Sequence, residues 1–456
     1  MTLRSFDSRF WLILAALGVL FGLVVLAGSL SGLASPRLVP EDGEIGAAGP
    51  LALVFAGSMD PASVEPRLSF DPPLSGTFRW RSLDGRPNRA VSFWPDEPLQ
   101  PGQTLTVRLA PGAASRSGLV LRQELTWQVK IRPAEALYLS PVEGPELWRA
   151  APGGQAAVQL THTDGKVFDY GVSPDGSEIV FSAYNEQSGV DLWQISRSGG
   201  EPRLLLPCQT DWCINPAYSP DGQTIAYSRR RAGAAEGEGP GVPRIWLLDL
   251  YSLTTDLLYS NPAIGGADPS WSPDGRCLAF FDGLSGGIRV VEMPTKTSFL
   301  LPSQTGQTGE WSPDSRNLIF TDVASGDAGP YMAVFVADVQ TQQIRRVLED
   351  DLNQADYSNP VWTPDGSEVA AAMRLMTGSP ARQLWLISLS GGRRAITNNQ
   401  LFTHSSYHWD LAGANLIYQR LEIGSSGQKP QVCVWNRASQ ESIILAENAF
   451  QPGWIP

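Results

Sequence analysis

The amino-acid sequence predicts an all-β chain: a seven-bladed β-propeller over residues 136–456, preceded by a β-sandwich over residues 38–133 and one transmembrane helix over residues 10–34. A six-bladed ring is the alternative. Three observations support this prediction: a turn-forming sequence recurs at blade spacing, Gly (45) and Pro (36) are abundant, and a long uncharged run lies near the N-terminus. Abundant Gly and Pro favour many short strands joined by tight turns over long helices.

The recurring sequence is an apolar or aromatic residue followed by Ser or Thr, then Pro, Asp, and Gly or Ser. In such a turn Pro sets φ at the second position, Asp bonds to nearby backbone, and Gly accepts positive φ. A weaker copy begins at Trp409. The five stronger copies recur about every 40 to 53 residues, which is blade spacing, at Val172–Gly176, Tyr218–Gly222, Trp271–Gly275, Trp311–Ser315 and Trp362–Gly366.

Each turn is preceded by one strand pattern and followed by three, and four strands in about 45 residues make one propeller blade. Ahead of the first turn lie three strand-like runs, at residues 136–140, 146–150 and 157–161, with no first strand before them. Residues 451–456 supply a strand with nothing after it. Pairing the two ends makes a composite blade that closes the ring and removes its free edges. The total is seven blades, or six if the first is irregular.

These repeats resemble the PD-type, WD-like repeats of the TolB-like propeller family, and the likeness covers about residues 136–456. The resemblance implies a closed ring of four-stranded blades. Known TolB-like rings have six blades and a different N-terminal domain, so the transport role of TolB itself is not carried over.

The segment at residues 38–133 contains short alternating strand patterns separated by Gly, Pro and Asp turns, which favours a β-sandwich. Its runs VPEDGEIGAAGPLALVFAGSMDPASV and FWPDEPLQPGQTLTVRLAPG resemble bacterial Ig-like domains of surface proteins. Such domains are usually spacers or adhesion modules. The resemblance therefore implies a stalk that lifts the propeller off a membrane.

No charged residue occurs from Phe10 to Pro36, and the run from Phe10 to Leu30 has about the 20 apolar residues that a bilayer core requires. Arg4 and Arg9 precede it, so residues 1–9 are expected in the cytoplasm and the remainder outside it. The predicted helix at residues 10–34 is an uncleaved signal anchor. A cleaved secretory signal is the alternative, although its apolar region is usually shorter.

The overall charge is acidic, with 34 Lys and Arg against 46 Asp and Glu and a net charge of −12. A nucleic-acid-binding protein needs a cationic surface, so this function class is excluded. With 42% hydrophobic residues and 15 Trp, the chain can bury enough surface to fold.

Four cysteines are present. Cys208 and Cys213 are close enough in sequence to form a disulfide in an exported protein. Cys277 and Cys433 lie inside apolar strand patterns and are expected to be small core residues. A metal site at the first pair is disfavoured, because no second Cys or His pair follows at zinc spacing.

Several residues invite a catalytic or metal-binding interpretation. Ser285 lies in a G-x-S-x-G sequence, but the next run is a strand pattern where a nucleophile elbow needs a helix, so a blade turn is favoured. His404, His408 and Asp410 would share one face of a regular strand. They could form a metal site there, or they could simply be polar residues that lead into an innermost strand. The repeated turn aspartates are explained by turn stabilisation. We therefore predict no catalytic, metal or cofactor site.

The connections between second and third strands are long and variable, whereas those between third and fourth strands are short. In a propeller the long connections share a face with the links between blades, so that face is the better candidate for binding. Charged side chains that simply meet water at strand ends are the alternative explanation. The candidate binding face comprises Tyr184, Arg229, Arg230, Asp282, Asp322, Arg374 and Arg420.

Together these features predict a membrane-anchored, extracytoplasmic binding or scaffold protein that presents its propeller to a protein or glycan at the cell envelope. The expected location is the cell membrane, with a single pass. One alternative is a propeller hydrolase or lyase acting on peptide or polysaccharide, which turnover by the purified protein would reveal. Another is a sensor or assembly factor for a membrane complex, because propellers host many unrelated functions.

Overall fold

The computed structural model describes residues 35–39, 43–47, 49–154, 157–233, 239–326, 329–348, 355–424 and 427–456. The chain forms two compact units, one extending to Ile45 and including Pro50–Arg132, the other comprising Gly46–Gly49 and Pro133–Pro456. Among the described residues, β-strands are the dominant element and no helix is long and apolar enough to cross a membrane. The predicted transmembrane helix at residues 10–34 lies outside the described residues.

The first unit contains two four-stranded sheets. One has the order β1 (Arg37–Val39), β3 (Leu51–Val54), β6 (Arg86–Pro95) and β5 (Gly76–Leu83). The other has the order β2 (Glu44–Ile45), β8 (Leu125–Ile131), β7 (Thr104–Leu109) and β4 (Leu68–Asp71). Burial alternates along β7, where Leu105, Val107 and Leu109 are buried, as expected for a strand with one face toward a core. A short helix, α2 (Pro61–Val64), and a 3₁₀ turn, η1 (Glu65–Arg67), follow Asp60, whose side chain caps the helix.

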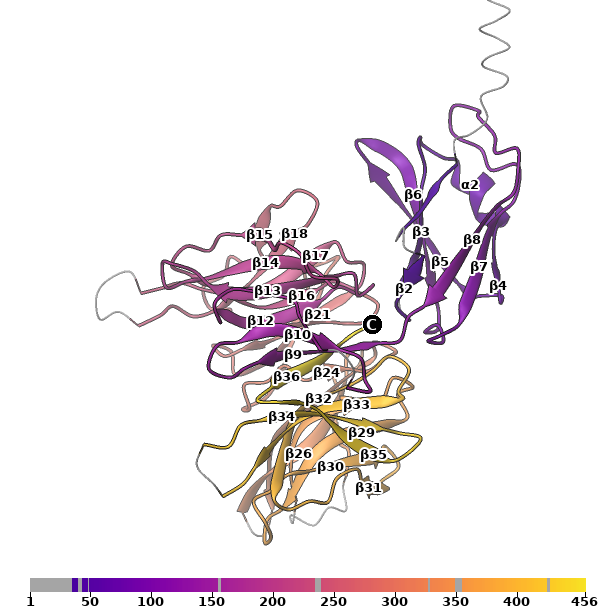
Figure 1. Ribbon diagram of the computed structural model, residues 1–456. Helices are drawn as coiled ribbons and strands as arrows, with labels where there is room; N and C mark the ends of the chain where they lie inside the picture. The colour runs from indigo at the N-terminus through magenta and orange to yellow at the C-terminus, as the bar shows by residue number, and fades with distance from the viewer. Residues whose placement is uncertain are drawn as a thin grey trace, which may run out of the picture. The chain divides into compact units, whose positions relative to one another are not determined.

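The second unit is a β-propeller built from successive antiparallel sheets, in which the strand that precedes each repeated turn comes first (Figure 1). We call these first strands the inner strands. The first full set is β12 (Val167–Val172), β13 (Glu178–Tyr184), β14 (Val190–Ser196) and β15 (Arg203–Leu206). It is followed by β16 (Trp212–Tyr218), β17 (Thr224–Arg230), β18 (Arg244–Asp249) and β19 (Thr255–Leu257). A parallel pairing between Val190 and Trp212 joins these two sets into one eight-stranded sheet.

Four further sheets follow in chain order within the described residues. They are β20 (Ala267–Trp271), β21 (Cys277–Asp282), β22 (Gly287–Glu292) and β23 (Ser298–Pro302); then β24 (Glu310–Trp311), β25 (Asn317–Gly326), β26 (Gly329–Asp338) and β27 (Ile344–Arg346). The next are β28 (Ala355–Trp362), β29 (Glu368–Leu375), β30 (Gln383–Ser388) and β31 (Arg393–Ala395); then β32 (Phe402–Trp409), β33 (Asn415–Glu422), β34 (Gln431–Asn436) and β35 (Glu441–Glu447).

The remaining sheet combines the two ends of the propeller unit. It has the order β11 (Val158–Gln159), β10 (Glu146–Ala150), β9 (Glu135–Ser140) and β36 (Phe450–Ile455). Figure 1 shows the yellow β36 beside the purple β9. The Tyr170 hydroxyl of the next inner strand donates to the Gln451 carbonyl (2.5 Å), and the Leu137 carbonyl oxygen lies 3.2 Å from the same hydroxyl. Both ends of this unit are thus fastened to β12 as well as to each other.

The repeated turns owe their shape to hydrogen bonds within a few residues. In the first, the Ser173 hydroxyl donates to the Asp175 carboxylate (2.6 Å) and accepts from the Glu178 amide (2.9 Å). Gly176 adopts φ 64°, the left-handed region that favours Gly. Ser315 takes the same conformation, with φ 62°, so the copy that lacks Gly forms the turn as well.

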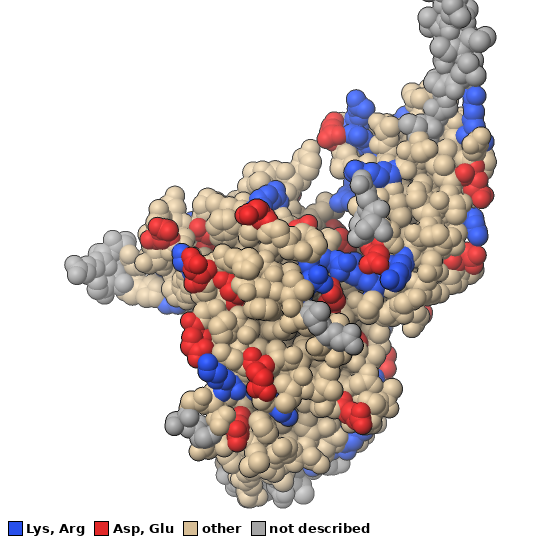
Figure 2. Space-filling view, in the orientation of Figure 1, with Lys and Arg blue, Asp and Glu red and all other residues tan. Residues whose placement is uncertain are grey.

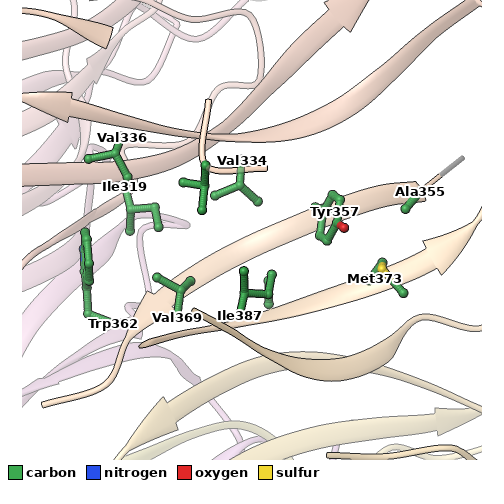
Figure 3. Packing of buried hydrophobic residues seen from close by; sticks show 11 residues of the cluster. Ile319, Val334, Val336, Ala355, Tyr357, Trp362, Val369, Met373 and Ile387 are labelled. Atoms are coloured by element: carbon green, nitrogen blue, oxygen red, sulfur yellow. The ribbon is translucent and has the colours of Figure 1, made fainter. Parts of the chain in front are cut away.

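Apolar side chains pack between neighbouring sheets. In Figure 3, Ile319 and Val336 of the β24–β27 sheet lie opposite Trp362, Val369 and Ile387 of the β28–β31 sheet. All five are buried. Each such aliphatic side chain stabilises the fold by about 1.5 to 3 kcal/mol through burial. The core is therefore a series of layers between sheets, which holds the inner strands in fixed positions around the centre.

Candidate functional site

The predicted binding-face residues occupy the ends of second strands, at equivalent places in successive sheets, and three of the four arginines have partners there. Arg229 pairs with Asp211 (Nε–Oδ2 2.9 Å). Arg374 pairs with Asp356 (Nη2–Oδ2 2.8 Å). Arg420 donates to Gln431 (2.7 Å), with its guanidinium 4.3 Å from the Phe402 ring centroid. These three side chains therefore contribute to the packing of their own sheets.

The two predicted aspartates fasten the connections between sheets. Asp282 is fully buried, accepts from the Gly265 amide (3.0 Å) and pairs with Arg289 (2.9 Å). Burial alone would raise the pKa of Asp282, but hydrogen bonds from Ser285, Arg289 and Gly265 together hold it below its usual value. Asp322 accepts from the Gln304 amide (3.1 Å). Both carboxylates thus accept hydrogen bonds from backbone amides in the connections between successive sheets.

Arg230 differs from the other three predicted arginines. Its Nε is buried without a hydrogen-bond partner, and among the described residues no hydrogen bond or ion pair engages its guanidinium. Arg230 is the cross-strand partner of Trp212, which in turn pairs with Val190, and Val190 pairs with Tyr184. Tyr184, Trp212 and Arg230 therefore lie on one row across the two sets that form the eight-stranded sheet.

Three aromatic rings form a cluster on this row. Phe168, Tyr184 and Trp212 meet edge to face, with centroids 5.7 to 5.9 Å apart. Tyr184 is 39% exposed, and Phe168 and Trp212 are partly exposed. We call Phe168, Tyr184 and Trp212 the ring cluster. It lies at the end of the propeller where the inner strands begin, which is the end predicted for binding, and Arg230 lies beside it.

A disulfide between Cys208 and Cys213, with Cα atoms 6.3 Å apart, closes the loop that carries Trp212. The Cys208 amide donates to the Asp191 carboxylate (2.6 Å), and the Trp212 indole donates to the Ser188 carbonyl (3.2 Å). These contacts hold the Trp212 ring in place before any partner arrives. Such preorganisation lowers the entropic cost of binding.

The other two cysteines are free thiols within strands. Cys433 is buried, and burial raises its pKa to about 11. Cys277 is partly buried, and burial likewise raises its pKa. Neither thiol is therefore activated as a nucleophile.

The expectation that His404, His408 and Asp410 share one face is wrong. A β-bulge with Ser406 at φ 44° lies between the two histidines and inverts the alternation of side chains. His404 is buried, with Nδ1 2.8 Å from the Arg382 carbonyl, and burial lowers its pKa to about 4. His408 faces the centre of the ring, and Asp410 accepts from the Ala414 amide within its turn (2.8 Å).

Ser285 lies in the turn between β21 and β22, where its amide donates to Asp282 (3.2 Å) and its hydroxyl accepts from Arg289 (3.0 Å). Among the described residues, neither of these hydrogen bonds involves a histidine, as a nucleophile and base would require. Within the described ranges, no group of three or more His, Cys, Asp or Glu side chains is arranged to hold a metal ion.

The sequence did not predict the cavity at the centre of the ring. Its volume is about 850 Å³, and its wall runs along β12 from Asp169, the residue after Phe168, to the repeated turn at Ser173 and Pro174. Two of its lining residues are the carboxylates Asp169 and Asp268, contributed by β12 and β20. Burial raises the pKa of Asp169 to about 6 and also raises that of Asp268. Burial lowers the pKa of His408, which also lines the cavity.

A third inner-strand carboxyl, Glu310 on β24, is partly buried. Burial raises its pKa to about 8, and a hydrogen bond from the Trp362 backbone opposes the rise. Figure 2 shows acidic and basic side chains interspersed among uncharged residues on one face of the molecule. The inner-strand carboxyls Asp169, Asp268 and Glu310 thus have pKa values raised by burial, whereas charges of both signs are interspersed on the surface shown in Figure 2.

No family model matches the chain. An uncharacterized protein of Agrobacterium fabrum, Atu1656, is 23% identical over 313 residues, which cover 59% of this chain and 96% of that protein.

Solved structures similar to this chain include TolB from Acinetobacter baumannii (17% identity, TM-score 0.42, 71% of this chain and 83% of that chain). Oligogalacturonate lyase from Vibrio parahaemolyticus is 13% identical, with TM-score 0.49, over 69% of this chain and 86% of that chain. The β-propeller domain of the Trilobed protease from Pyrococcus furiosus is 12% identical, with TM-score 0.45, over 76% and 93%. At these values the similarities carry no argument about function.

Proposed function

We propose that this chain is a non-enzymatic binding protein of the cell envelope, which takes a partner protein at the end of the propeller where the inner strands begin. The observation that carries the proposal is the ring cluster with Arg230 beside it, whose guanidinium has no hydrogen-bond or ion-pair partner among the described residues. Trp, Tyr and Arg dominate the energetic hot spots of protein interfaces. A rigid aromatic group next to a guanidinium offers both an apolar contact and hydrogen-bond donors to a partner.

The remaining parts of the chain have supporting roles in this proposal. Residues 10–34 anchor the chain in the membrane, with residues 1–9 in the cytoplasm. Residues 38–133 are a bacterial Ig-like spacer. Residues 136–456 form a seven-bladed TolB-like ring outside the cytoplasm. Protease added to intact cells that digests this ring would support the orientation, whereas complete protection would contradict it.

The binding role is tested by photo-crosslinking in intact cells. A photoreactive phenylalanine analogue replaces Tyr184, and a matched analogue replaces Tyr251, which is 82% exposed in the turn between β18 and β19. We expect a discrete protein adduct at position 184 that position 251 does not give. Trp212→Ala and Arg230→Ala should each abolish it. Equal labelling at both positions, or an adduct that survives both substitutions, would contradict the proposal.

The alternatives predict other outcomes of the same experiments. A glycan ligand would leave no protein adduct, but the purified protein would bind envelope polysaccharide in a Trp212-dependent way. A sensor or assembly factor would crosslink to subunits of a membrane complex. A hydrolase or lyase would turn over peptide or polysaccharide, and loss of that turnover on replacing His404 or His408 by Ala would overturn the non-enzymatic assignment.

A further inference from the structure

We propose that the central cavity is a second binding site, and that it takes a protonated amine or guanidinium group, as carried by a Lys or Arg side chain of a peptide. This site is distinct from the ring cluster, because none of the three ring-cluster residues lines the cavity. Its volume of about 850 Å³ is in the range of small-molecule and peptide side-chain pockets.

The charge of the cavity points to a cation. Asp169 and Asp268 line it, and no Lys or Arg is among the described residues of its wall. Elsewhere in the propeller the buried or half-buried aspartates Asp211, Asp282 and Asp356 each pair with an arginine. Among the described residues, the cavity carboxylates thus lack the arginine partners that these other aspartates have.

The two carboxylates have different roles. Asp169 is buried and already engaged, since Ser182 donates to one oxygen and the Asn215 amide donates to the other (2.7 Å). Asp268 lines the cavity, where hydrogen bonds from Thr308 partly offset the rise in its pKa that burial causes, and within the described part of the chain it has no ion-pair partner. Asp268 is therefore the group that meets the ligand, and Asp169 adds negative potential behind it.

Aromatic side chains complete the wall. Tyr218, Trp271, Trp409 and Trp454 line the cavity. The Trp271 indole donates to the Ala217 carbonyl (3.2 Å) and the Trp454 indole to the His408 carbonyl (2.9 Å), which fixes both rings. Aromatic faces attract ammonium and guanidinium groups through the ring quadrupole. His408 adds no opposing charge near neutral pH, because its pKa is lowered by burial.

The test uses the purified full-length protein and two tripeptides that are acetylated at the N-terminus and amidated at the C-terminus. One contains lysine and the other acetyllysine at the same place. We expect calorimetry and tryptophan fluorescence to detect binding of the lysine peptide, weakened by added salt. The acetyllysine peptide should bind at least tenfold more weakly. Equal binding of the two peptides, or no binding of either, would overturn the proposal.

Three variants locate the binding. Asp268→Asn should weaken the lysine peptide at least tenfold, whereas Asp256→Asn, which removes the same charge from the exposed outer strand β19, should leave affinity unchanged. Ser270→Arg places a cation in the cavity wall and should abolish binding even if Asp268→Asn folds poorly. Wild-type affinity in either cavity variant would refute the assignment. The crosslink at position 184 should survive Asp268→Asn, so failure of one proposal is distinguishable from failure of the other.

Discussion

Replacing Glu310 by Gln is expected to stabilise the propeller in alkaline solution. Burial raises the pKa of Glu310 from 4.5 to about 8, so at neutral pH its carboxyl is protonated in the folded chain and ionised in the unfolded chain. Because the folded-state pKa is the higher one, its contribution to stability is complete below about pH 4.5 and is lost as the pH rises through about 8. At ~1.4 kcal/mol per pH unit this interval corresponds to at most about 5 kcal/mol.

We expect roughly half of that limit, about 2 to 3 kcal/mol, because Glu310 is only partly buried and water screens part of the penalty. Gln is nearly isosteric, and its carbonyl oxygen can still accept the hydrogen bond from the Trp362 backbone. The difference in unfolding free energy between variant and wild type should therefore be small at pH 5 and should reach this value in favour of the variant at pH 9.

The assay is urea denaturation of both proteins at pH 5, 7 and 9, followed by tryptophan fluorescence and circular dichroism. Taking the difference between variant and wild type removes the titration of groups that both share, such as Asp169 and His404. Glu441→Gln, on the exposed strand β35, is the matched control and should show no trend with pH. The reasoning is refuted if the Glu310→Gln difference is the same at pH 5 and pH 9, or if the variant is the less stable protein at pH 9.

Three further predictions concern the framework of the propeller. Replacing Cys208 and Cys213 together by Ser should lower the unfolding free energy by about 2 kcal/mol, as expected for so short a disulfide loop, and should make the melting temperature insensitive to dithiothreitol; a melt that still responds would contradict this. Ile455→Ala removes a fully buried side chain from β36 and should cost about 2 to 5 kcal/mol in urea denaturation, so an unchanged midpoint would argue against the closing strand. Gly366→Ala should cost about 1 to 2 kcal/mol because residue 366 needs positive φ, with no steric conflict, since the nearest atom to an added Cβ is 3.7 Å away; a stabilised variant would be the contrary result.

The repeated turns could be predicted from sequence because their hydrogen bonds are local. Ser173, Asp175 and Gly176 act within one five-residue stretch, so residue type alone specifies the turn. The strands could be predicted from apolar alternation for the same reason. The propeller then follows from the regular spacing of turns and strands.

The bulge at Ser406 could not be predicted, and it decides where His408 lies. Ser has no strong preference for positive φ, so the left-handed conformation of Ser406 is determined by the packing around the strand and not by its residue type. The same limit applied to the cavity, which depends on distances between inner strands far apart in sequence. Asp268 precedes a repeated turn and Trp271 begins it, so from sequence both are predicted only to be strand and turn residues.

The candidate binding face is a column of mostly polar residues at strand ends. The sequence alone does not show which of these side chains have hydrogen-bond or ion-pair partners within the fold. Arg229 and Arg374 have acidic partners, whereas Arg230 has none among the described residues. Trp212 was missed, although its place between the two disulfide cysteines is a usable signal. An aromatic residue inside a short disulfide-closed loop is held near the surface, where a role in binding a partner is the main reason to expect it.

The composite sheet sets a requirement on biosynthesis. Ser140 at the end of β9 bonds to the Asn448 carbonyl, and 308 residues separate them. At ribosomal speeds of roughly 5 to 20 residues per second, β9 has no final neighbour for about 15 seconds to a minute. During that time its open edge can pair with other chains in the crowded compartment. A holdase that covers this early hairpin should therefore raise the yield of native protein, and premature termination near residue 448 should produce aggregates instead of a shorter functional ring.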